Sequence, residues 1–385
     1  MRVGGVPYRS IWPDPDGAGV WIIDQTRLPH EFETRRLCRL EDAAEAIRRM
    51  RVRGAPLIGV TAAWGVALAL REDPSGTALD EACRELSATR PTAVNLAWAL
   101  AAMRAAVWEL PSARRAARAW QRAGELADED AALCRAIGGH GLGLLEAAFE
   151  RRGRRGPLQV LTHCNAGWLA TVDWGTALAP VYRAHDAGIP LHVWVDETRP
   201  RNQGASLTAW ELAEHGVPHT VVADSAGGHL MQTGRVDLVL CGCDRATARG
   251  EVCNKVGTYP AALAARDNGV PFYVALPYPT IDWSVEDARA GIPIEERSGD
   301  EVRRVRGRAD DGRILEVEIL PRGSPAANFA FDLTPAELVT ALVTERGVCE
   351  ASAEGLLGLY PERRSDREPW ERSTSSPRPS ATSRT

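Results

Sequence analysis

The sequence has almost no lysine. Only one of its 46 basic residues, Lys255, is a lysine, and the rest are arginines. The simplest cause is a coding bias that converts lysine to arginine wherever either residue serves. A compact ammonium and a planar guanidinium differ most where the geometry is tight, so we predict that Lys255 lies in a functional site. Survival of a single lysine by chance is the alternative.

Long hydrophobic runs and basic blocks are also missing. The longest apolar stretch, around residues 62–70, is too short to span a bilayer, and residues 1–10 contain no apolar signal segment. The formal net charge is −5, and no basic cluster within the predicted folded part suggests a nucleic-acid surface. We therefore expect a cytoplasmic protein whose partner is a small molecule, with no membrane or nucleic acid involved.

The eight cysteines are too sparse for a secreted disulfide scaffold. We expect most of them to be free thiols in the core. Cys241, Cys243 and Cys253 do not have the spacing of paired zinc ligands, so no metal is predicted. The glycine-rich run at 224–229 is not a G-x-G-x-x-G motif, and no acidic residue stands at the right distance to bind a ribose. We therefore expect no cofactor.

Residues 1–150 are typical of a small mixed domain of strands and helices. The segment 19–25 is strand-like, and alanine-rich apolar stripes at helical spacing predict helices over 41–50, 56–70 and 95–110 and a helical hairpin over 113–150. The cluster of arginines and glycines at 151–157 resembles a linker. We place a domain boundary there.

Residues 151–350 show a regular alternation of short β-rich runs and helical stretches. The runs are 158–162, 191–195, 219–223, 236–241 and 271–276. This pattern predicts βαβ units around a buried parallel sheet, and hence an α/β fold. Each run is followed by a polar segment rich in glycine or proline, and ligands of open α/β sheets bind at that edge.

The end of the chain gives two further predictions. Thr334, Pro335 and Glu337 match a helix start with a capping box, which predicts a helix over 333–347. From residue 361 to 385 the chain is rich in serine, proline and arginine and nearly free of apolar residues, so we expect it to be disordered.

Cys164 is a candidate catalytic residue because it follows the run 158–162 and precedes a predicted helix. A helix N-terminus lowers the pKa of a thiol, which would make it a usable acid or base. A buried, inert cysteine is the alternative. His163 is not expected to pair with Cys164, because adjacent residues of an extended strand point to opposite faces.

Asp244 lies at the same sheet edge, after the run 236–241, although a loop aspartate is more often a turn former. Asn254 and Lys255 stand ten residues later, at the start of a predicted helix that would bind phosphate. Further donors to an anion or a sugar are offered by three other segments, namely Arg53–Gly54–Ala55, Arg90 and Gln203.

The motifs at these positions closely resemble those of the methylthioribose-1-phosphate isomerase family. The resemblance covers residues 5–348 and includes RVRGAPLIGV, RPTAVNLAWAL, LTHCNAGWLAT, WVDETRPRNQGASLTAWEL, CDRATARGEVCNKVGTYPAALAA and PFYVALPYPTIDW. It implies a small N-terminal α+β domain joined to a Rossmann-like C-terminal domain, usually in a homodimer. It also implies that Cys164 and Asp244 are catalytic and that Arg53, Gly54, Ala55, Arg90, Gln203, Asn254 and Lys255 bind the substrate.

Such an enzyme would convert 5-methylthioribose 1-phosphate to 5-methylthioribulose 1-phosphate in methionine salvage. The ring of an aldose 1-phosphate cannot open spontaneously, so we assign Asp244 as acid and base at the ring and C2 oxygens and Cys164 at carbon. A hydride shift is the alternative. Trp168, Cys243 and Cys253 depart from the commonest family pattern, so 5-deoxyribose 1-phosphate and ribose 1,5-bisphosphate stay open as substrates. Non-catalytic regulatory subunits of a translation initiation factor share the superfamily.

Overall fold

The computed structural model describes residues 1–364. Of the tail predicted to be disordered, residues 361–364 form a short 3-10 helix, η5 (Pro361–Arg364), so the prediction is wrong for these four. The remainder of that tail, residues 365–385, lies outside the described residues.

The N-terminal part consists of a small antiparallel sheet covered by helices. The strands β3 (Ile11–Pro13), β4 (Val20–Ile23) and β5 (Thr34–Leu37) form the sheet, and β1 (Arg2–Val3) pairs with β2 (Val6–Pro7) beside it. The helices are α1 (Leu40–Arg48), α2 (Ala55–Glu72), α3 (Gly76–Thr89) and α4 (Val94–Val107). The strand and the three single helices predicted here are confirmed. α2 is buried on nearly every side, which makes it the centre of this core.

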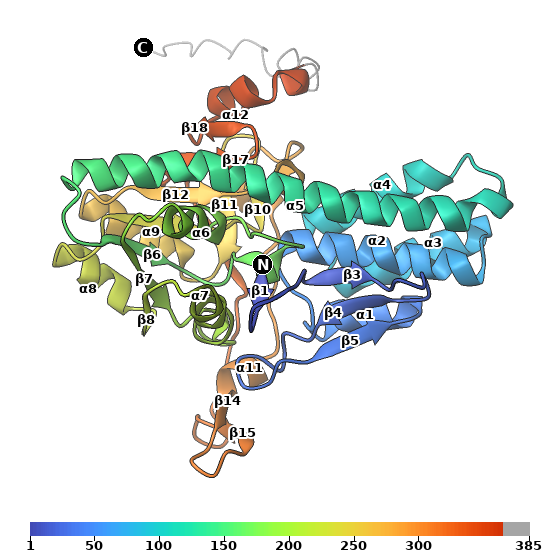
Figure 1. The fold of residues 1–385 in the computed structure, drawn as a ribbon, viewed down its shortest axis with the longest axis horizontal. Helices are drawn as coiled ribbons and strands as arrows, with labels where there is room; N and C mark the ends of the chain where they lie inside the picture. The colour runs from blue at the N-terminus through green and yellow to red at the C-terminus, as the bar shows by residue number, and fades with distance from the viewer. Residues whose placement is uncertain (365–385) are drawn as a thin grey trace, which may run out of the picture.

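Helix α5 (Ser112–Arg151) is one continuous helix, so the predicted helical hairpin is wrong. Its first half packs into the core around α2, and its second half packs against α6 (Leu178–Asp186), which covers the main sheet. Contacts along both halves stabilise a straight helix where the sequence suggested a turn. Figure 1 shows α5 running across both parts of the molecule. The cluster 151–157 marks the end of α5 and the start of the first parallel strand, and the domain boundary there stays a prediction.

The main sheet has seven strands in the order β18-β17-β12-β9-β6-β7-β8. All pairings are parallel except that of β17 with β18. The five predicted strands are confirmed as β6 (Leu158–Thr162), β7 (Leu191–Asp196), β8 (His219–Val222), β9 (Leu238–Cys241) and β12 (Phe272–Ala275). Apolar clusters cover both faces, as expected for a mainly parallel sheet in an α/β fold.

The predicted helix over 333–347 is wrong. The segment instead forms the end of β16 (Phe331–Thr334), a 3-10 turn η4 (Ala336–Leu338), and the strands β17 (Ala341–Thr344) and β18 (Gly347–Cys349). The residues of β17 are all buried, and a short apolar run that is buried on both faces has no helical or strand periodicity of its own. Its pairing with β12 decides the conformation, against the local capping signal.

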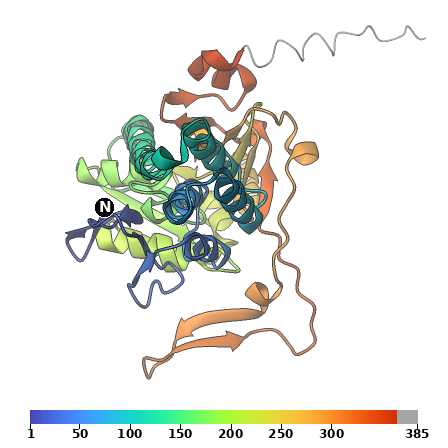
Figure 2. The same ribbon diagram turned by 90° about the vertical axis from the view of Figure 1, so that its right-hand side faces the viewer.

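A second sheet has the order β13-β10-β11-β16, with β10 (Arg245–Thr247), β11 (Val252–Lys255) and β13 (Ile281–Asp282). A separate hairpin of β14 (Arg304–Arg308) and β15 (Ile314–Glu318) extends away from the body, as Figures 1 and 2 show. The remaining elements are η1 (Trp168–Ala170), η2 (Gly204–Thr208), α7 (Ala209–His215), α8 (Ala226–Gln232), α9 (Thr258–Asp267), η3 (Tyr278–Thr280), α10 (Ala288–Gly291), α11 (Asp300–Arg303) and α12 (Ala353–Leu359).

None of the helices in residues 1–364 combines the length and hydropathy that crossing a membrane requires. All eight cysteines are free thiols. Only Cys134, Cys241 and Cys253 are fully buried, and Cys38 is exposed. Cys83, Cys243 and Cys349 are partly buried and pack against the apolar core, so the expectation of mostly free thiols in the core is confirmed.

Candidate active site

The loop after β6 carries Cys164 in a left-handed backbone conformation, with φ of 66°. Two threonines hold it there. The backbone N–H of Cys164 donates to Thr198 Oγ1 at 2.8 Å, and Thr208 Oγ1 donates to the Cys164 carbonyl at 2.7 Å. No helix begins here, because only the 3-10 turn η1 follows and α6 starts at residue 178. The predicted helix N-terminus beside Cys164 is therefore wrong.

Behind this loop lies the fully buried carboxylate of Glu211. It accepts hydrogen bonds from Asn165 Nδ2 at 2.9 Å, from the backbone N–H groups of Trp168 and Leu169 at 2.9 Å, and from Tyr182 Oη at 2.7 Å. Four donors on one carboxylate fix the path of the loop that follows Cys164. The indole of Trp168 is buried and lies 6.1 Å from the ring of Trp210, within the core rather than in a cavity.

Asp244 lies immediately before β10, which pairs antiparallel with β11. The Asp244 N–H donates to the Cys253 carbonyl at 3.0 Å, and this pairing brings Asp244 next to Asn254. Asn254 and Lys255 end the strand β11 and do not begin a helix, so that prediction is wrong, and α9 starts only at Thr258. The hairpin is the physical reason why residues ten positions apart meet.

The N-terminus of α2 faces the same place. Arg53 is 8% exposed, and its guanidinium donates to the Asn165 carbonyl at 2.7 Å and to the Asn165 side-chain oxygen. Gly54 is the N-cap with φ of 94°, and a Cβ there would lie 2.4 Å from the Ala170 carbonyl oxygen. Only glycine therefore lets α2 approach the loop so closely.

These segments enclose a small pocket of about 30 Å³. Six of the predicted site residues line it together, namely Arg53, Gly54, Ala55, Cys164, Asp244 and Asn254. Cys243 lines it as well. This volume holds about one water molecule, so a sugar phosphate must extend beyond it or enter as the surrounding segments move apart.

Three predicted site residues lie outside the small pocket. Lys255 is 6% exposed, and its Nζ donates to the Ala330 carbonyl at 3.2 Å. Arg90 forms an ion pair with Glu295 at 2.8 Å. Gln203 is buried, and its side-chain oxygen has no hydrogen-bond partner among the described residues.

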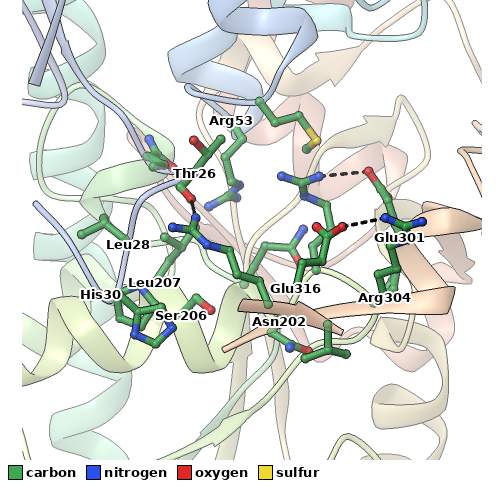
Figure 3. A pocket seen from close by; sticks show the side chains of 18 of the residues that line it. Thr26, Leu28, His30, Arg53, Asn202, Ser206, Leu207, Glu301, Arg304 and Glu316 are labelled. Carbon is green, nitrogen blue, oxygen red and sulfur yellow. Dashed lines mark hydrogen bonds and ion pairs between the residues drawn. The ribbon is translucent and has the colours of Figure 1, made fainter. Parts of the chain in front are cut away.

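Gln203 lines a larger cavity of about 550 Å³, shown in Figure 3. Arg53 lines both cavities, so the two are neighbours. The wall of the larger cavity is rich in charge and includes the ion pairs Arg201–Glu301 at 3.0 Å and Arg304–Glu316 at 3.2 Å. The hairpin β14–β15 forms one side of it.

Three comparisons with known proteins identify the family and the fold. A family model described as the Initiation factor 2 subunit family matches residues 51–351. The methylthioribose-1-phosphate isomerase of Rhodospirillum rubrum is 65% identical over 94% of both chains, and that of Methylobacterium nodulans is 64% identical over 94% of this chain and 99% of its own. The chain belongs to the methylthioribose-1-phosphate isomerase family.

Solved structures give the same result for the fold. The crystal structure of 5-methylthioribose 1-phosphate isomerase from Pyrococcus horikoshii has a TM-score of 0.79 and 37% identity, over 92% of this chain and 96% of that one. A structure described as translation initiation factor eIF-2B, subunit delta, from A. fulgidus has a TM-score of 0.75 and 38% identity, over 92% of this chain and all of that one.

Burial dominates the electrostatics of the pocket. It raises the pKa of the Cys164 thiol; the guanidinium of Arg53 acts against the rise, and the carboxyl of Asp244 adds to it. Burial also raises the pKa of Asp244, against the opposing charges of Arg53, Arg90 and Lys255. Burial lowers the pKa of Lys255. The sequence-based idea of a helix that lowers the thiol pKa is therefore wrong in direction.

One group of described residues has metal-ligating atoms within 4.8 Å of one another, namely His163, Asp196 and Asp224. Both ring nitrogens of His163 already face acceptors, and Asp224 accepts the N–H groups of Thr198 and Arg199 at 2.6 and 2.7 Å. The ring nitrogens of His163 and both oxygens of Asp224 thus serve the protein's own hydrogen bonds, whereas Asp196 Oδ1 has no hydrogen-bond partner among the described residues.

Sequence reasoning missed the residues that support the site. Thr198, Thr208 and Glu211 hold the Cys164 loop, yet each comes from a segment 34 to 47 residues away in sequence. Each lies in a quoted motif, but no local spacing distinguishes a buried glutamate that accepts four hydrogen bonds from one at the surface.

Proposed function

We propose that this chain is an aldose-ketose isomerase that converts 5-methylthioribose 1-phosphate to 5-methylthioribulose 1-phosphate, a reaction of methionine salvage. One observation carries the proposal for the site. Cys164 and Asp244 line a single small pocket with Arg53 and the N-terminus of α2, in a chain whose curated relatives carry the isomerase name.

The substrate phosphate binds where positive charge and backbone N–H groups converge. The first turn of α2 provides a helix N-terminus, which favours an anion, and Arg53 stands beside it. Lys255 and Asn254 approach from the end of β11. The C5 end of the sugar then extends toward the larger cavity, because the small pocket has no room for it. Arg90 supports Asp244 by its charge, and Gln203 offers its unpartnered amide oxygen to a sugar hydroxyl.

The raised pKa of Cys164 refines the mechanism. At neutral pH the residue is a thiol, which can donate a proton but cannot abstract one from carbon. We therefore assign Cys164 as the acid that protonates the ring oxygen while the bond between C1 and that oxygen breaks. Asp244, held near three cations, accepts the proton of the C2 hydroxyl. The hydrogen on C2 moves to C1 with its electron pair, and C2 becomes the ketone carbon.

Substrate deuterated at C2 tests this route. Complete retention of deuterium in the ketose supports the direct shift, whereas exchange with solvent would assign Cys164 as the carbon base of an enediol route. Turnover that is unaffected by Cys164→Ala and by Asp244→Asn would refute the site.

The alternatives concern the substrate and the class of protein. An isomerase assay that compares 5-methylthioribose 1-phosphate, 5-deoxyribose 1-phosphate and ribose 1,5-bisphosphate identifies the group that the enzyme prefers at C5. A clear preference for the bisphosphate would overturn the proposed substrate. The likeness to a structure described as an initiation factor subunit makes a non-catalytic regulatory role the alternative. A regulatory subunit would show no turnover with any of these sugars.

We also propose that the protein is cytoplasmic and acts as a homodimer. The free thiols support a reducing compartment. The family resemblance supports the dimer, and light scattering after gel filtration measures it. A monomer at working concentration would refute it.

A further inference from the structure

The imidazole of His163 is fully enclosed between two acceptors. Its Nδ1 lies 2.9 Å from Asp196 Oδ2, and its Nε2 lies 2.9 Å from the carbonyl oxygen of Val256. His163 and Asp196 are each 2% exposed. His163 is the residue before Cys164, and Val256 is the residue after Lys255, so the ring connects the two sides of the proposed site.

We propose that His163 is a positioning residue, which with Asp196 keeps a proton on Nε2 and so ties the Cys164 loop to the segment that follows Lys255. The proposal rests on the proposed isomerase function only for its effect on turnover. The hold on the Cys164 loop and the proton on His163 Nε2 can both be tested without any substrate.

The two contacts fix the number of protons. A backbone carbonyl can only accept, so the contact with Val256 requires a proton on Nε2. The contact between Nδ1 and Asp196 requires a second proton, which lies either on the ring or on the carboxyl. Both arrangements leave Nε2 protonated. A neutral imidazole facing an ionised carboxylate would satisfy only one of the two contacts.

The tie joins three strand ends. His163 follows β6, Asp196 ends β7, and Val256 follows β11. The end of β7 and the loop after it hold both His163 and Cys164. Asp196 binds the His163 ring, and Thr198 Oγ1 accepts the Cys164 N–H. Thr198 Oγ1 also donates to the Asp196 carbonyl at 3.0 Å. Loss of the ring would therefore release the Cys164 loop from the β11 side and leave the β7 side in place.

Gly257 supports this interpretation. It has φ of 109°, and a Cβ at this position would lie 2.5 Å from His163 Cε1. The ring therefore packs directly on the backbone between Lys255 and α9, where a side chain would displace it.

The charged and titratable groups around the ring come from four elements. They are Asp196 at the end of β7, Asp224 before α8, Asp332 in β16 and Cys241 at the end of β9. Asp224 and Asp332 are already held by backbone N–H groups. Burial acts to lower the pKa of His163, but the hydrogen bond and charge of Asp196 outweigh it and the pKa is raised.

Two amide substitutions separate the two contacts. In His163→Gln the side-chain amide reaches the position of Nε2 and can still donate to the Val256 carbonyl. In His163→Asn it reaches only the position of Nδ1, so it can contact Asp196 but not Val256. We expect kcat in His163→Asn to fall at least about tenfold below that in His163→Gln, with the smaller change in KM. The same two substitutions at His215, which pairs with the more exposed Asp186 at the same 2.9 Å, are the matched control and leave kcat unchanged.

Two further measurements do not depend on turnover. Alkylation of Cys164 by iodoacetamide, followed by peptide mass, is expected to be several-fold faster in His163→Asn than in His163→Gln, because the loop is released. A neutron diffraction structure of the wild-type protein is expected to show a deuteron on Nε2.

Equal kcat and equal alkylation in the two variants would overturn the proposal, and so would a His163 ring without a deuteron on Nε2. If neither variant folds, the neutron structure decides alone. If no pentose phosphate is turned over while both substrate-free measurements agree, the isomerase function fails and the positioning role stands.

Discussion

Two carboxyl groups of the site region differ in their surroundings. Glu211, behind the Cys164 loop, is fully buried, and Asp244, in the pocket, is partly exposed. Glu211 accepts four hydrogen bonds. The carboxylate of Asp244 has no hydrogen-bond partner among residues 1–364 and is offset only by the charges of nearby Arg53, Arg90 and Lys255. Hydrogen bonds occupy the lone pairs of the first group, whereas charge stabilises the second and leaves its oxygens open.

This difference is the one expected between a structural carboxyl and the proposed reactive one. Burial raises the pKa of both groups. A proton acceptor needs a free lone pair, which Asp244 has and Glu211 lacks. Asp130, on α5, is intermediate, because it accepts one hydrogen bond, from the Val172 N–H at 2.7 Å.

The largest effect is expected from Asp244→Asn, which keeps the shape of the side chain and removes the carboxylate that would accept a proton. Turnover should fall by about 10²–10⁴-fold. Because the folded-state pKa of Asp244 is raised, its ionisation opposes folding as pH rises through that pKa, so the variant should be at least as stable as the wild type at neutral pH. Steady-state kinetics and thermal unfolding on one preparation measure both quantities. A variant with lower stability and unchanged turnover would contradict both expectations and would assign Asp244 a structural role.

Glu211→Gln should act on stability instead. A glutamine offers one acceptor oxygen to four donors and places an NH₂ group among them, which we expect to cost roughly 3–5 kcal/mol of unfolding free energy. Glu214→Gln, on the exposed side of the same helix α7, is the matched control and should cost much less. Urea unfolding compares the two. Equal costs would show that the four hydrogen bonds do not hold the loop.

Asp130 should make the free energy of unfolding depend on pH. Burial raises its pKa to about 7. A raised folded-state pKa means that its contribution to stability is fully present below about pH 4 and is lost as pH rises through about 7, by about 4 kcal/mol at most. Asp130→Asn should remove this loss and make stability less dependent on pH in that window. Asp128→Asn, which changes an exposed residue of the same helix, should not. Urea unfolding from pH 4.5 to 8 measures the slopes, and identical slopes in wild type and Asp130→Asn would contradict the expectation.

Much of this arrangement was readable from the sequence. Strands buried on both faces were predicted where short β-rich runs alternated with helical stretches, and the parallel sheet places their polar ends at one edge. The prediction failed at β17, whose four buried residues have no periodicity, and at β11, where Asn254 and Lys255 end a strand. In both places the pairing with a distant strand decides the structure, and no local signal records it.

The candidate residues were found by motif, but their chemical state was not. The thiol of Cys164 was expected to have a lowered pKa, and burial raises it. Glu211 was not singled out, because its four donors, in the loop 165–169 and at Tyr182, lie 29 to 46 residues away in sequence. Burial and the identity of hydrogen-bond partners are properties of the packed chain, so sequence reasoning found two candidate residues that line one pocket but not their environment.

The smallest effect is expected from Lys255→Arg, which tests whether the cations near Asp244 act by charge alone. A guanidinium keeps the charge but is larger and planar, and the buried Nζ of Lys255 has the Ala330 carbonyl at 3.2 Å as its partner. We expect KM to rise about tenfold, which corresponds to about 1.4 kcal/mol of binding free energy, with a smaller change in kcat. Steady-state kinetics at fixed ionic strength measure the split. Because every other basic residue in the chain is an arginine, an unchanged KM would mean that charge suffices here and that this one lysine survives by chance.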